Sequence, residues 1–276
     1  MSLDKLSIII VNYNTRDDLR LCLTALRDCQ PMPEVIVVDN ASKDGSAEMV
    51  RDEFPQVTLL APGRNTWFCG GNNLGIQAAH RDYVLLLNPD TIPSQAALEA
   101  MVRFMDEHPD YAGATSQLRY PDGVIQRTCS RIPTYRYLIL TQTPLRWLLS
   151  GMRKRAEAWH WYEGWERDTD YDVEAMPGSC LLMRRDQLQL DDRLLLYFPE
   201  DDLARRMEGR KFRFLASNPI VHREKSATRN ALATRIYFRD LIVYTRKHHG
   251  LTGAALMWLL TRPLLWGMML RWWMRR

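Results

Sequence analysis

The first 108 residues alternate between short, continuous apolar runs and segments whose apolar residues have helical spacing. The apolar runs are Leu6 to Val11, Val35 to Val38, Val57 to Leu60 and Tyr83 to Leu87. Runs of this kind are typical of strands that are buried on both faces. The segments between them predict helices over residues 17–29, 44–54, 72–79 and 95–108. This order predicts an α/β fold with a mostly parallel sheet, flanking helices and right-handed crossovers.

The pattern loosens after Tyr111. A strand region is predicted over residues 173–183, broken by Pro177-Gly178, and a helix over residues 199–209. Short strands are predicted over residues 212–215 and 219–222, whereas residues 130–170, rich in Arg and Trp, fit no regular pattern. From Thr228 the chain predicts a helix to Gly250 and a second helical stretch to its end.

Composition and charge narrow the class of protein. A hydrophobic fraction of 46% and a charged fraction of 25% argue against disorder. The N-terminus does not resemble a secretory signal, and the five scattered cysteines suggest neither a zinc site nor disulfides, so a cytoplasmic protein is expected. From Arg223 onward, eleven basic and two acidic residues give a net charge of +9, which leaves −5 for residues 1–222 of a chain whose total is +4. An anionic partner, membrane or nucleic acid, is expected for the basic tail.

The last 26 residues are apolar, basic and rich in tryptophan. Trp258, Trp266, Trp272 and Trp273 lie among leucines and methionines, and Arg262-Pro263 interrupts the apolar run near its middle. This pattern favours a helix that lies in the membrane interface, with Trp at the level of the headgroups. A membrane-spanning helix and a helix packed on the domain or on a partner remain alternatives. The apolar Trp content favours lipid over nucleic acid, and no nucleic-acid recognition motif is present.

Polar side chains follow three of the four predicted strands. Asn12 follows the first, Asp39 the second, and Asn88-Pro89-Asp90 the fourth. Because ligands bind beyond the carboxyl ends of the strands in open parallel sheets, these residues are expected to line one site. Neither a Gly-x-Gly-x-x-Gly fingerprint nor a Gly-Lys-Ser/Thr phosphate loop is present. A bound diphosphate would therefore need a divalent cation, for which Asp90 is the obvious ligand.

These stretches resemble family 2 glycosyltransferases with the GT-A fold. The matching segments span roughly the first 225 residues and are residues 7–14, 34–46, 65–75, 85–91, 176–185 and 197–222. The resemblance implies a GT-A domain over residues 1–225 and leaves residues 226–276 as a helical tail that associates with a membrane. Asn88-Pro89-Asp90, with the Gly- and Asn-rich stretch at 70–75, resembles the rhamnosyltransferase-like subgroup that builds bacterial surface polysaccharides.

The resemblance also implies roles for individual residues. The residues implied on the donor side are Val11, Asn12, Tyr13, Asp39, Asn72, Asn88 and Asp90. The residues implied on the acceptor side are Pro177, Gly178, Ser179 and Asp202. Asp90, with His222, would hold Mg²⁺ or Mn²⁺. The acidic run would supply the catalytic base, as Glu200 if the family motif is matched without a gap and as Asp201 if it is shifted by one residue.

Three positions depart from the family pattern. Asn88 replaces the first Asp of the Asp-x-Asp motif and removes one charge from the metal site. The acidic run reads Glu200-Asp201-Asp202 in place of Glu-Asp-x-Asp, and Trp67 stands where relatives often have Gly. The run could also serve only as a helix N-terminus, with Asp201–Arg205 and Asp202–Arg206 pairs four residues apart.

The chemistry expected of such a site is direct displacement at the anomeric carbon. One carboxylate removes the proton of the acceptor hydroxyl, and a cation stabilises the leaving diphosphate. No further carboxylate stands out as the nucleophile of a retaining route. The sequence therefore predicts an inverting transferase that uses a nucleotide-sugar donor and a glycan or lipid-linked acceptor at the inner face of the cell membrane. The alternative is a catalytically degenerate relative that binds a nucleotide or a glycan.

Overall fold

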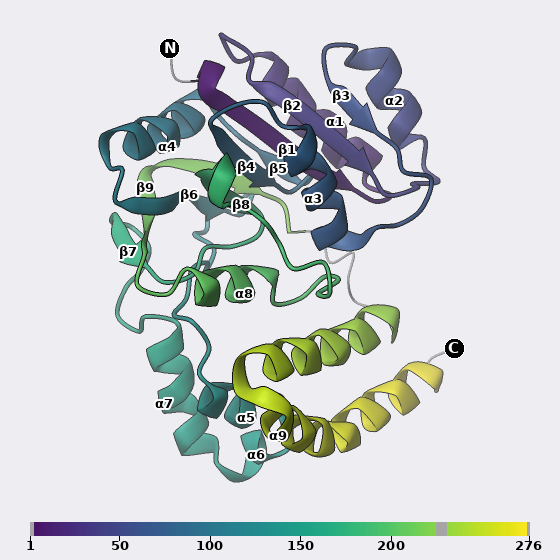
Figure 1. Ribbon diagram of the computed structural model, residues 1–276, viewed down its shortest axis with the longest axis vertical. Coiled ribbons are helices and arrows are strands. Elements are labelled where there is room, and N and C mark those ends of the chain that lie inside the picture. Colours follow the sequence, from purple (N-terminus) through teal and green to yellow (C-terminus); the bar gives the residue numbers. More distant parts are fainter. Residues whose placement is uncertain (1–2, 225–230, 275–276) are drawn as a thin grey trace.

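The computed structural model describes residues 3–224 and 231–274. Its centre is a single mixed sheet of nine strands, in the order β3-β2-β1-β4-β8-β6-β9-β5, with β7 paired to β9 (Figure 1). Helices cover both faces of this sheet, and a separate group of helices, α5, α6, α7 and α9, lies beyond α8 at the far end of the molecule. The GT-A-like α/β architecture with a C-terminal helical tail is confirmed.

The first half of the chain folds as predicted. The strands are β1 (Leu6–Asn12), β2 (Glu34–Asp39), β3 (Thr58–Leu60) and β4 (Tyr83–Leu87), and β1 pairs in parallel with both β2 and β4. The helices are η1 (Leu3–Lys5), α1 (Arg16–Arg27), α2 (Ser46–Glu53), α3 (Trp67–Ala78) and α4 (Gln95–Glu107). Of these, α3 begins five residues before the predicted start.

The second half of the sheet differs from the prediction of a mostly parallel sheet. Strand β8 (Cys180–Arg184) runs antiparallel to β4 and to β6 (Tyr111–Arg119), and β5 (Thr91–Ile92) and β7 (Tyr171–Val173) run antiparallel to β9. Strand β9 (Lys211–His222) is one continuous strand where two short ones were predicted, and it is parallel to β6. Strand β6 was not predicted, because Gly, Ser, Thr and Gln interrupt its apolar residues although seven of its nine are buried.

The unassigned region 130–170 contains three short helices. They are α5 (Tyr135–Gln142), α6 (Leu145–Leu148) and α7 (Ser150–His160). The predicted helix at 199–209 is α8 (Pro199–Arg206), and η2 (Arg185–Gln187) precedes it.

Helix α9 (Ala231–Trp273) bends sharply at Gly250, whose φ of 74° and ψ of 179° are not helical. The predicted break at Gly250 is confirmed, and the predicted start at Thr228 lies outside the described residues. The two halves of α9 fold back on each other (Figure 1). Helix α9 passes through Pro263. By length and composition alone it could cross a membrane, with a mean hydropathy of 1.3 over an 18-residue window of which 17% is buried.

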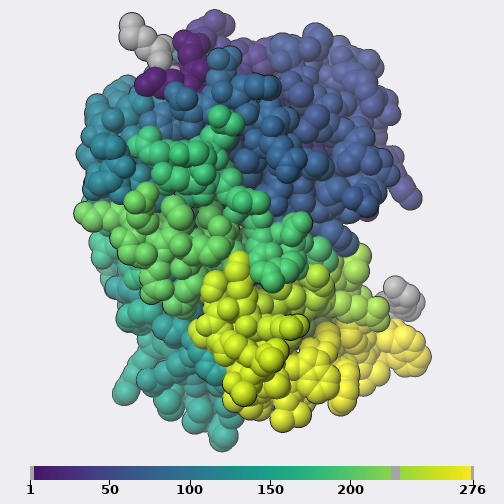
Figure 2. Space-filling view, in the orientation of Figure 1, coloured from purple at the N-terminus to yellow at the C-terminus, as the bar shows by residue number. Residues whose placement is uncertain are grey.

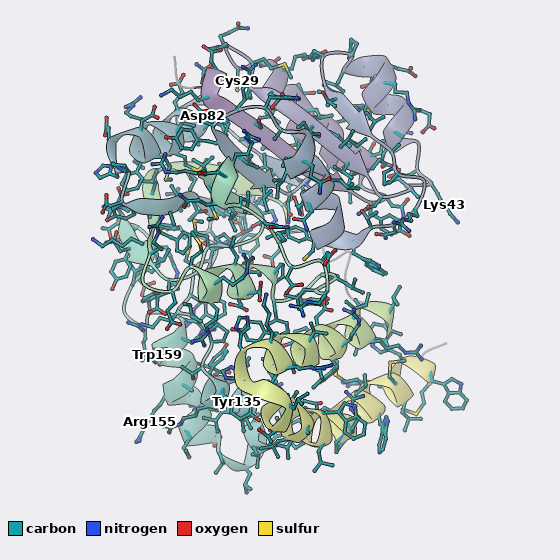
Figure 3. The ribbon with its side chains drawn as sticks, viewed as in Figure 1. Cys29, Lys43, Asp82, Tyr135, Arg155 and Trp159 are labelled. Atoms are coloured by element: carbon teal, nitrogen blue, oxygen red, sulfur yellow. The ribbon has the colours of Figure 1, made fainter. Side chains whose placement is uncertain are left out.

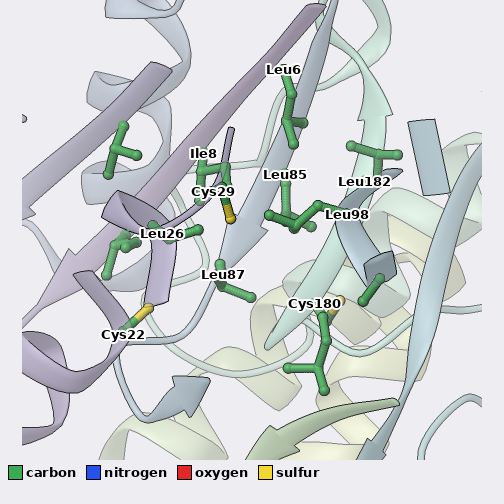
Figure 4. Close-up of a cluster of buried hydrophobic side chains, with 14 of the residues drawn as sticks. Leu6, Ile8, Cys22, Leu26, Cys29, Leu85, Leu87, Leu98, Cys180 and Leu182 are labelled. Atoms are coloured by element: carbon green, nitrogen blue, oxygen red, sulfur yellow. The ribbon is translucent and has the colours of Figure 1, made fainter. Parts of the chain in front are cut away.

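The sheet divides the core into two clusters. Along β1, Ile8 and Ile10 face a cluster formed with α1 and α4, whereas Ile9 faces a second cluster on the opposite side. This alternation follows from the two-residue repeat of a strand. The first cluster also contains Leu85, Leu98 and Leu182 (Figure 4). All five cysteines are buried and free.

The second cluster joins the tail to the sheet. It contains Phe238, Leu241 and Tyr244 from the first half of α9, together with Val84 and Leu86 from β4. These α9 side chains are at least 95% buried. The first half of α9 is therefore an integral part of the packed domain, and the second half adds Met257 to the same cluster.

Candidate active site

The ends of β1 and β2 carry a buried polar network. Asn12 lies opposite Asp39 in the parallel register, and Asn12 Nδ2 donates to Asp39 Oδ1 at 2.9 Å. The backbone N–H of Ser42 donates to Asp39 Oδ2 at 3.0 Å. Asn12 is fully buried, and through this hydrogen bond its side chain holds the Asp39 carboxylate in place. Val11 is half-buried and Tyr13 is exposed at the same edge of the sheet.

Helix α3 packs unusually close to this edge. A Cβ atom on Gly75 would stand 2.4 Å from Ile9 Cγ2, and one on Gly71 would stand 2.8 Å from Val11 Cγ1. Both glycines therefore allow the helix to approach β1. Asn72 is buried, and its side chain donates to the carbonyl of Phe68 within α3. Trp67, at the position where the resemblance implied Gly, has a φ of +63°, a conformation that favours glycine.

The Asn88-Pro89-Asp90 turn brings Asp90 beside His222. Thr91 on β5 pairs with His222 on β9, and Asp90 Oδ1 lies 3.3 Å from His222 Nε2. Both side chains are nearly buried, with 13% and 10% exposed. The structure thus brings together the two residues that the family resemblance implied for a metal.

Gln126 fixes the tautomer of His222. Its amide nitrogen donates to the His222 carbonyl at 2.7 Å, so its amide oxygen must be the atom that lies 2.8 Å from His222 Nδ1. An amide oxygen only accepts, and therefore Nδ1 carries the proton. In the neutral ring, Nε2 then directs its lone pair toward the Asp90 carboxylate. Two electron-pair donors that face each other at this distance suit a shared cation.

The described residues hold no group of three or more His, Cys, Asp or Glu side chains arranged for a metal. Asp90 and His222 thus offer two protein ligands. A hard divalent cation that binds substrate phosphates commonly takes only one or two protein carboxylates and completes its shell with phosphate and water oxygens. The residues present therefore fit Mg²⁺ or Mn²⁺ held jointly with a diphosphate.

The loop at 177–179 links the Asp90 turn to the acidic run. The backbone N–H of Asn88 donates to the Ser179 carbonyl at 3.1 Å. A Cβ atom on Gly178 would stand 3.8 Å from Glu200 Oε2. The Asp90 turn and the Glu200 carboxylate therefore both lie beside one short loop.

Glu200 and Asp201 lie in the first turn of α8 and line a pocket of about 360 Å³. The other lining residues include Arg127, Tyr137, Gln142, Trp161, Pro177 and Tyr237. Burial raises the pKa of Glu200. Burial and the adjacent Glu200 charge raise the pKa of Asp201 well above its usual value. A carboxylate with a raised pKa is a stronger base, which suits proton removal from a hydroxyl.

The surroundings of the two carboxylates differ. Burial raises the pKa of Cys69 on α3, and the Glu200 charge is the largest of the electrostatic contributions that raise it further. The Asp201 charge acts instead on Tyr137, Tyr237 and Tyr244, from α5 and α9. The Glu200 charge thus acts on a thiol of α3, and the Asp201 charge acts on tyrosines of α5 and α9.

Asp202 is fully buried and does not line the pocket. It pairs with Arg206 at 2.9 Å, with Lys247 at 2.6 Å and with His248 at 2.7 Å. Burial alone would raise the pKa of Asp202, but the bonds from these three residues outweigh it and leave the pKa lowered. The Asp202–Arg206 pair considered from the sequence is present, and these contacts support a structural role in place of the acceptor role that was predicted.

Replacing Asp202 by asparagine is expected to destabilise the protein by about 2 kcal/mol at neutral pH, since it removes charged hydrogen bonds in a buried site. The folded-state pKa of Asp202 is lowered, so its contribution is complete above the unfolded-state pKa and is lost as the pH falls below it. The stabilities of the two proteins should therefore converge toward acid. Urea unfolding at several pH values measures this, and a pH-independent difference would contradict the assignment.

A larger hollow of about 630 Å³ lies elsewhere, against α7. Arg155 and Trp159, labelled in Figure 3, line it together with Tyr162 and Trp165. None of the predicted site residues lines this hollow. We therefore place the candidate active site at the smaller pocket and the adjoining strand edge.

The model of the family "Glycosyl transferase family 2" matches residues 7–186. The chain belongs to glycosyl transferase family 2. This enzyme is 24% identical, over 95% of its own length and 91% of the relative's, to the N-acetylglucosaminyl-diphospho-decaprenol L-rhamnosyltransferase of Mycobacterium tuberculosis. It is 35% identical, over only 32% of its length, to the low-salt glycan biosynthesis hexosyltransferase Agl10 of Haloferax volcanii.

Solved structures share the fold of the enzyme. The mannosyltransferase PcManGT of Pyrobaculum calidifontis, in complex with GDP-Man and Mn²⁺, matches with a TM-score of 0.58 and 16% identity over 88% of this chain and 63% of its own. GalNAc-T7 with UDP, GalNAc and Mn²⁺ matches with a TM-score of 0.57 and 14% identity over 80% of this chain and 44% of its own. The enzyme thus spans less than two thirds of the length of either structure.

Several residues that surround the site were not found from the sequence. Gln126, Arg127 and Tyr137 come from the segment after β6, whose pattern indicates no regular structure, and Tyr237 comes from the tail. No local motif marks them. They reach the site only through tertiary packing, which brings Tyr137 of α5 and Tyr237 of α9 to the pocket that α8 lines.

Proposed function

We propose that the enzyme transfers a sugar with inversion from a nucleotide-diphosphate donor to a lipid-linked acceptor, in the synthesis of a bacterial surface polysaccharide. The observation that supports this best is the short loop at 177–179, which lies beside both the Asp90 turn and the Glu200 carboxylate. The name of the mycobacterial relative, which matches almost the whole chain, supports rhamnose as the sugar and a diphosphate-linked lipid as the acceptor.

The roles of the residues follow from their positions. Val11, Tyr13 and Asp39 bind the base and ribose of the donor, with Asn12 and Asn72 shaping their surroundings. Asn88, Asp90 and His222 lie at the diphosphate, where Asp90 and His222 would hold Mg²⁺ or Mn²⁺. A bound cation stabilises the charge that develops on the leaving diphosphate. Pro177, Gly178 and Ser179 separate the donor from the acceptor pocket.

Glu200 is the proposed general base. It accepts the proton of the acceptor hydroxyl as that oxygen attacks the anomeric carbon. Burial raises the pKa of Glu200, and burial together with the Glu200 charge raises the pKa of the neighbouring Asp201. Arg127 carries its guanidinium over the Trp161 ring at the same pocket, where a cation suits the phosphate of a lipid-linked acceptor.

We propose that residues 1–225 carry the catalytic residues and that the tail, residues 226–276, associates with the inner face of the cell membrane through the second half of α9. The first half of α9 also contributes Tyr237 to the acceptor pocket. Tail and active site would therefore be connected directly.

The test is a donor screen with Mg²⁺ or Mn²⁺ present. Sugar transfer to a lipid diphosphate acceptor would be followed for dTDP-rhamnose and for UDP- and GDP-linked sugars. We expect turnover with one nucleotide class and loss of turnover on chelation. Tight nucleotide binding without product from any donor would contradict the proposal and favour a degenerate binding protein.

Replacing Gln126 by alanine is expected to weaken Mn²⁺ binding in the presence of a nucleoside diphosphate by about 10- to 100-fold, because the tautomer of His222 is no longer fixed. Calorimetric titration measures this independently of turnover. Replacing the exposed Gln189 by alanine serves as the control. Unchanged Mn²⁺ affinity in the Gln126 variant would remove His222 from the metal site.

A further inference from the structure

Helix α6 and the start of α7 form an apolar tip, which we define as residues 145–152. The exposed fractions are 67% for Trp147, 78% for Leu148 and 40% for Met152. None of the four α6 residues is buried. A Trp-Leu pair this exposed covers no part of the protein's own core, and such patches mark contact with a partner or a membrane.

The tip is surrounded by positive charge. Arg146, Arg153, Lys154 and Arg155 lie within or just after it, and no Asp or Glu occurs from Leu145 to Ala156. Basic side chains beside exposed Trp and Leu are complementary to a surface that is anionic outside and apolar beneath. Such a surface is a lipid bilayer that contains anionic headgroups.

The second half of α9 has the same character. Its inner face packs through Ala254, Met257 and Thr261, which are at least 94% buried. Its outer face exposes large apolar side chains at Leu251, Leu256, Trp258, Leu259, Trp266, Met268, Leu270 and Trp273. No acid occurs from Leu251 to the end of the chain. A helix that is apolar on both faces requires an apolar environment on its outer side as well.

The tip and the second half of α9 lie at the same end of the molecule, opposite β1–β3 (Figures 1 and 2). Helix α5 connects them. It leads directly into α6, and Tyr135 at its start donates a hydrogen bond to the Gly253 carbonyl of α9 at 2.9 Å. Tyr135 lies against the bend of α9 in Figure 3. The two apolar surfaces are therefore held in a fixed relation by packed helices.

We infer that the α6 tip is a second membrane contact, which inserts Trp147 and Leu148 into an anionic bilayer alongside the outer face of α9. Two separate contacts fix the orientation of the enzyme on the membrane, whereas one helix alone would leave it free to rotate. Helices α5 and α9 also line the pocket, through Tyr137, Gln142 and Tyr237. The orientation therefore sets the distance between the acceptor pocket and the headgroups, and this last step rests on the proposed lipid-linked acceptor.

The test uses the full chain and sedimentation with vesicles of phosphatidylcholine, with or without phosphatidylglycerol. The variant Trp147→Gln/Leu148→Gln is expected to lower partition onto the anionic vesicles by about 10- to 100-fold. A matched control is Leu21→Gln/Val124→Gln, which replaces apolar residues that are 43% and 57% exposed on other elements. The control should bind vesicles as the unmodified enzyme does. Equal partition of the tip variant and the control would overturn the inference.

Two further measurements separate the alternatives. Sedimentation velocity in the absence of lipid detects a second copy of the chain as the occupant, and a dimer that the tip variant dissociates would overturn the membrane assignment.

Transfer to a water-soluble acceptor analogue should be unchanged in the tip variant, whereas transfer to a vesicle-embedded acceptor should fall with partition. Loss of both activities would assign the tip a structural role. Vesicle binding needs no donor, so failure of the proposed function would leave this result interpretable.

Discussion

Replacing Glu200 by glutamine is expected to lower kcat for sugar transfer by about 10²- to 10⁴-fold, the usual contribution of a general base. Glutamine keeps the size of the side chain beside Gly178 and removes only its ability to take a proton. Binding of a nucleoside diphosphate should change little, because the donor side is formed by other residues. Single-turnover rates with saturating donor measure the first quantity, and calorimetry measures the second.

The matched variant is Asp201→Asn, on the adjacent residue of the same helix. It is expected to retain more activity than the Glu200 variant and to leave the acid limb of kcat/KM in place. The reason is that burial raises the pKa of Glu200, whereas the Glu200 charge adds to the effect of burial on Asp201 and not the reverse. If Asp201→Asn is inactive while Glu200→Gln still transfers sugar, the general base is Asp201 and not Glu200.

Replacing Asp240 by alanine is expected to destabilise the enzyme by about 3–5 kcal/mol, the cost typical of breaking a buried charge interaction. Asp240 on α9 is fully buried. Its Oδ2 accepts the backbone N–H groups of Leu195, Leu196 and Tyr197 at 3.1, 2.9 and 3.0 Å. Alanine would leave these three donors without their acceptor.

The loop that Asp240 holds precedes α8 and contacts α3. The Leu195 carbonyl accepts the backbone N–H of Phe68 at 2.9 Å. Loss of Asp240 should therefore also lower kcat, because Glu200 and the donor side lose their common support. Urea unfolding measures the stability, and Asp52→Ala on the exposed surface of α2 is the control, expected to change it by less than about 0.5 kcal/mol. If Asp240→Ala also changed the free energy of unfolding by less than about 0.5 kcal/mol, α9 would not be what holds the loop at 195–197.

The strand edge illustrates what local pattern can predict. Asn12, Asp39 and Asp90 were placed at one edge because each follows an apolar run, and parallel strands end together. The structure pairs Asn12 with Asp39 and brings Asp90 beside His222. Strand β6 was missed because its buried polar residues hide the apolar pattern. Its neighbours in the sheet, and not its own composition, decide that it is a strand.

The sequence by itself determined the α/β order, the polar strand edge, the acidic start of α8 and the basic, apolar tail, because each is a repeat or cluster within a few residues. Only the tertiary structure decided that Gln126 sets the proton on His222, that Asp202 belongs to an ion cluster, and that Asp240 anchors the loop before α8. These contacts join residues 43 to 96 positions apart. These long-range contacts depend on how helices and strands pack. A local sequence pattern does not predict which distant residue will form the hydrogen bond that a buried polar group needs.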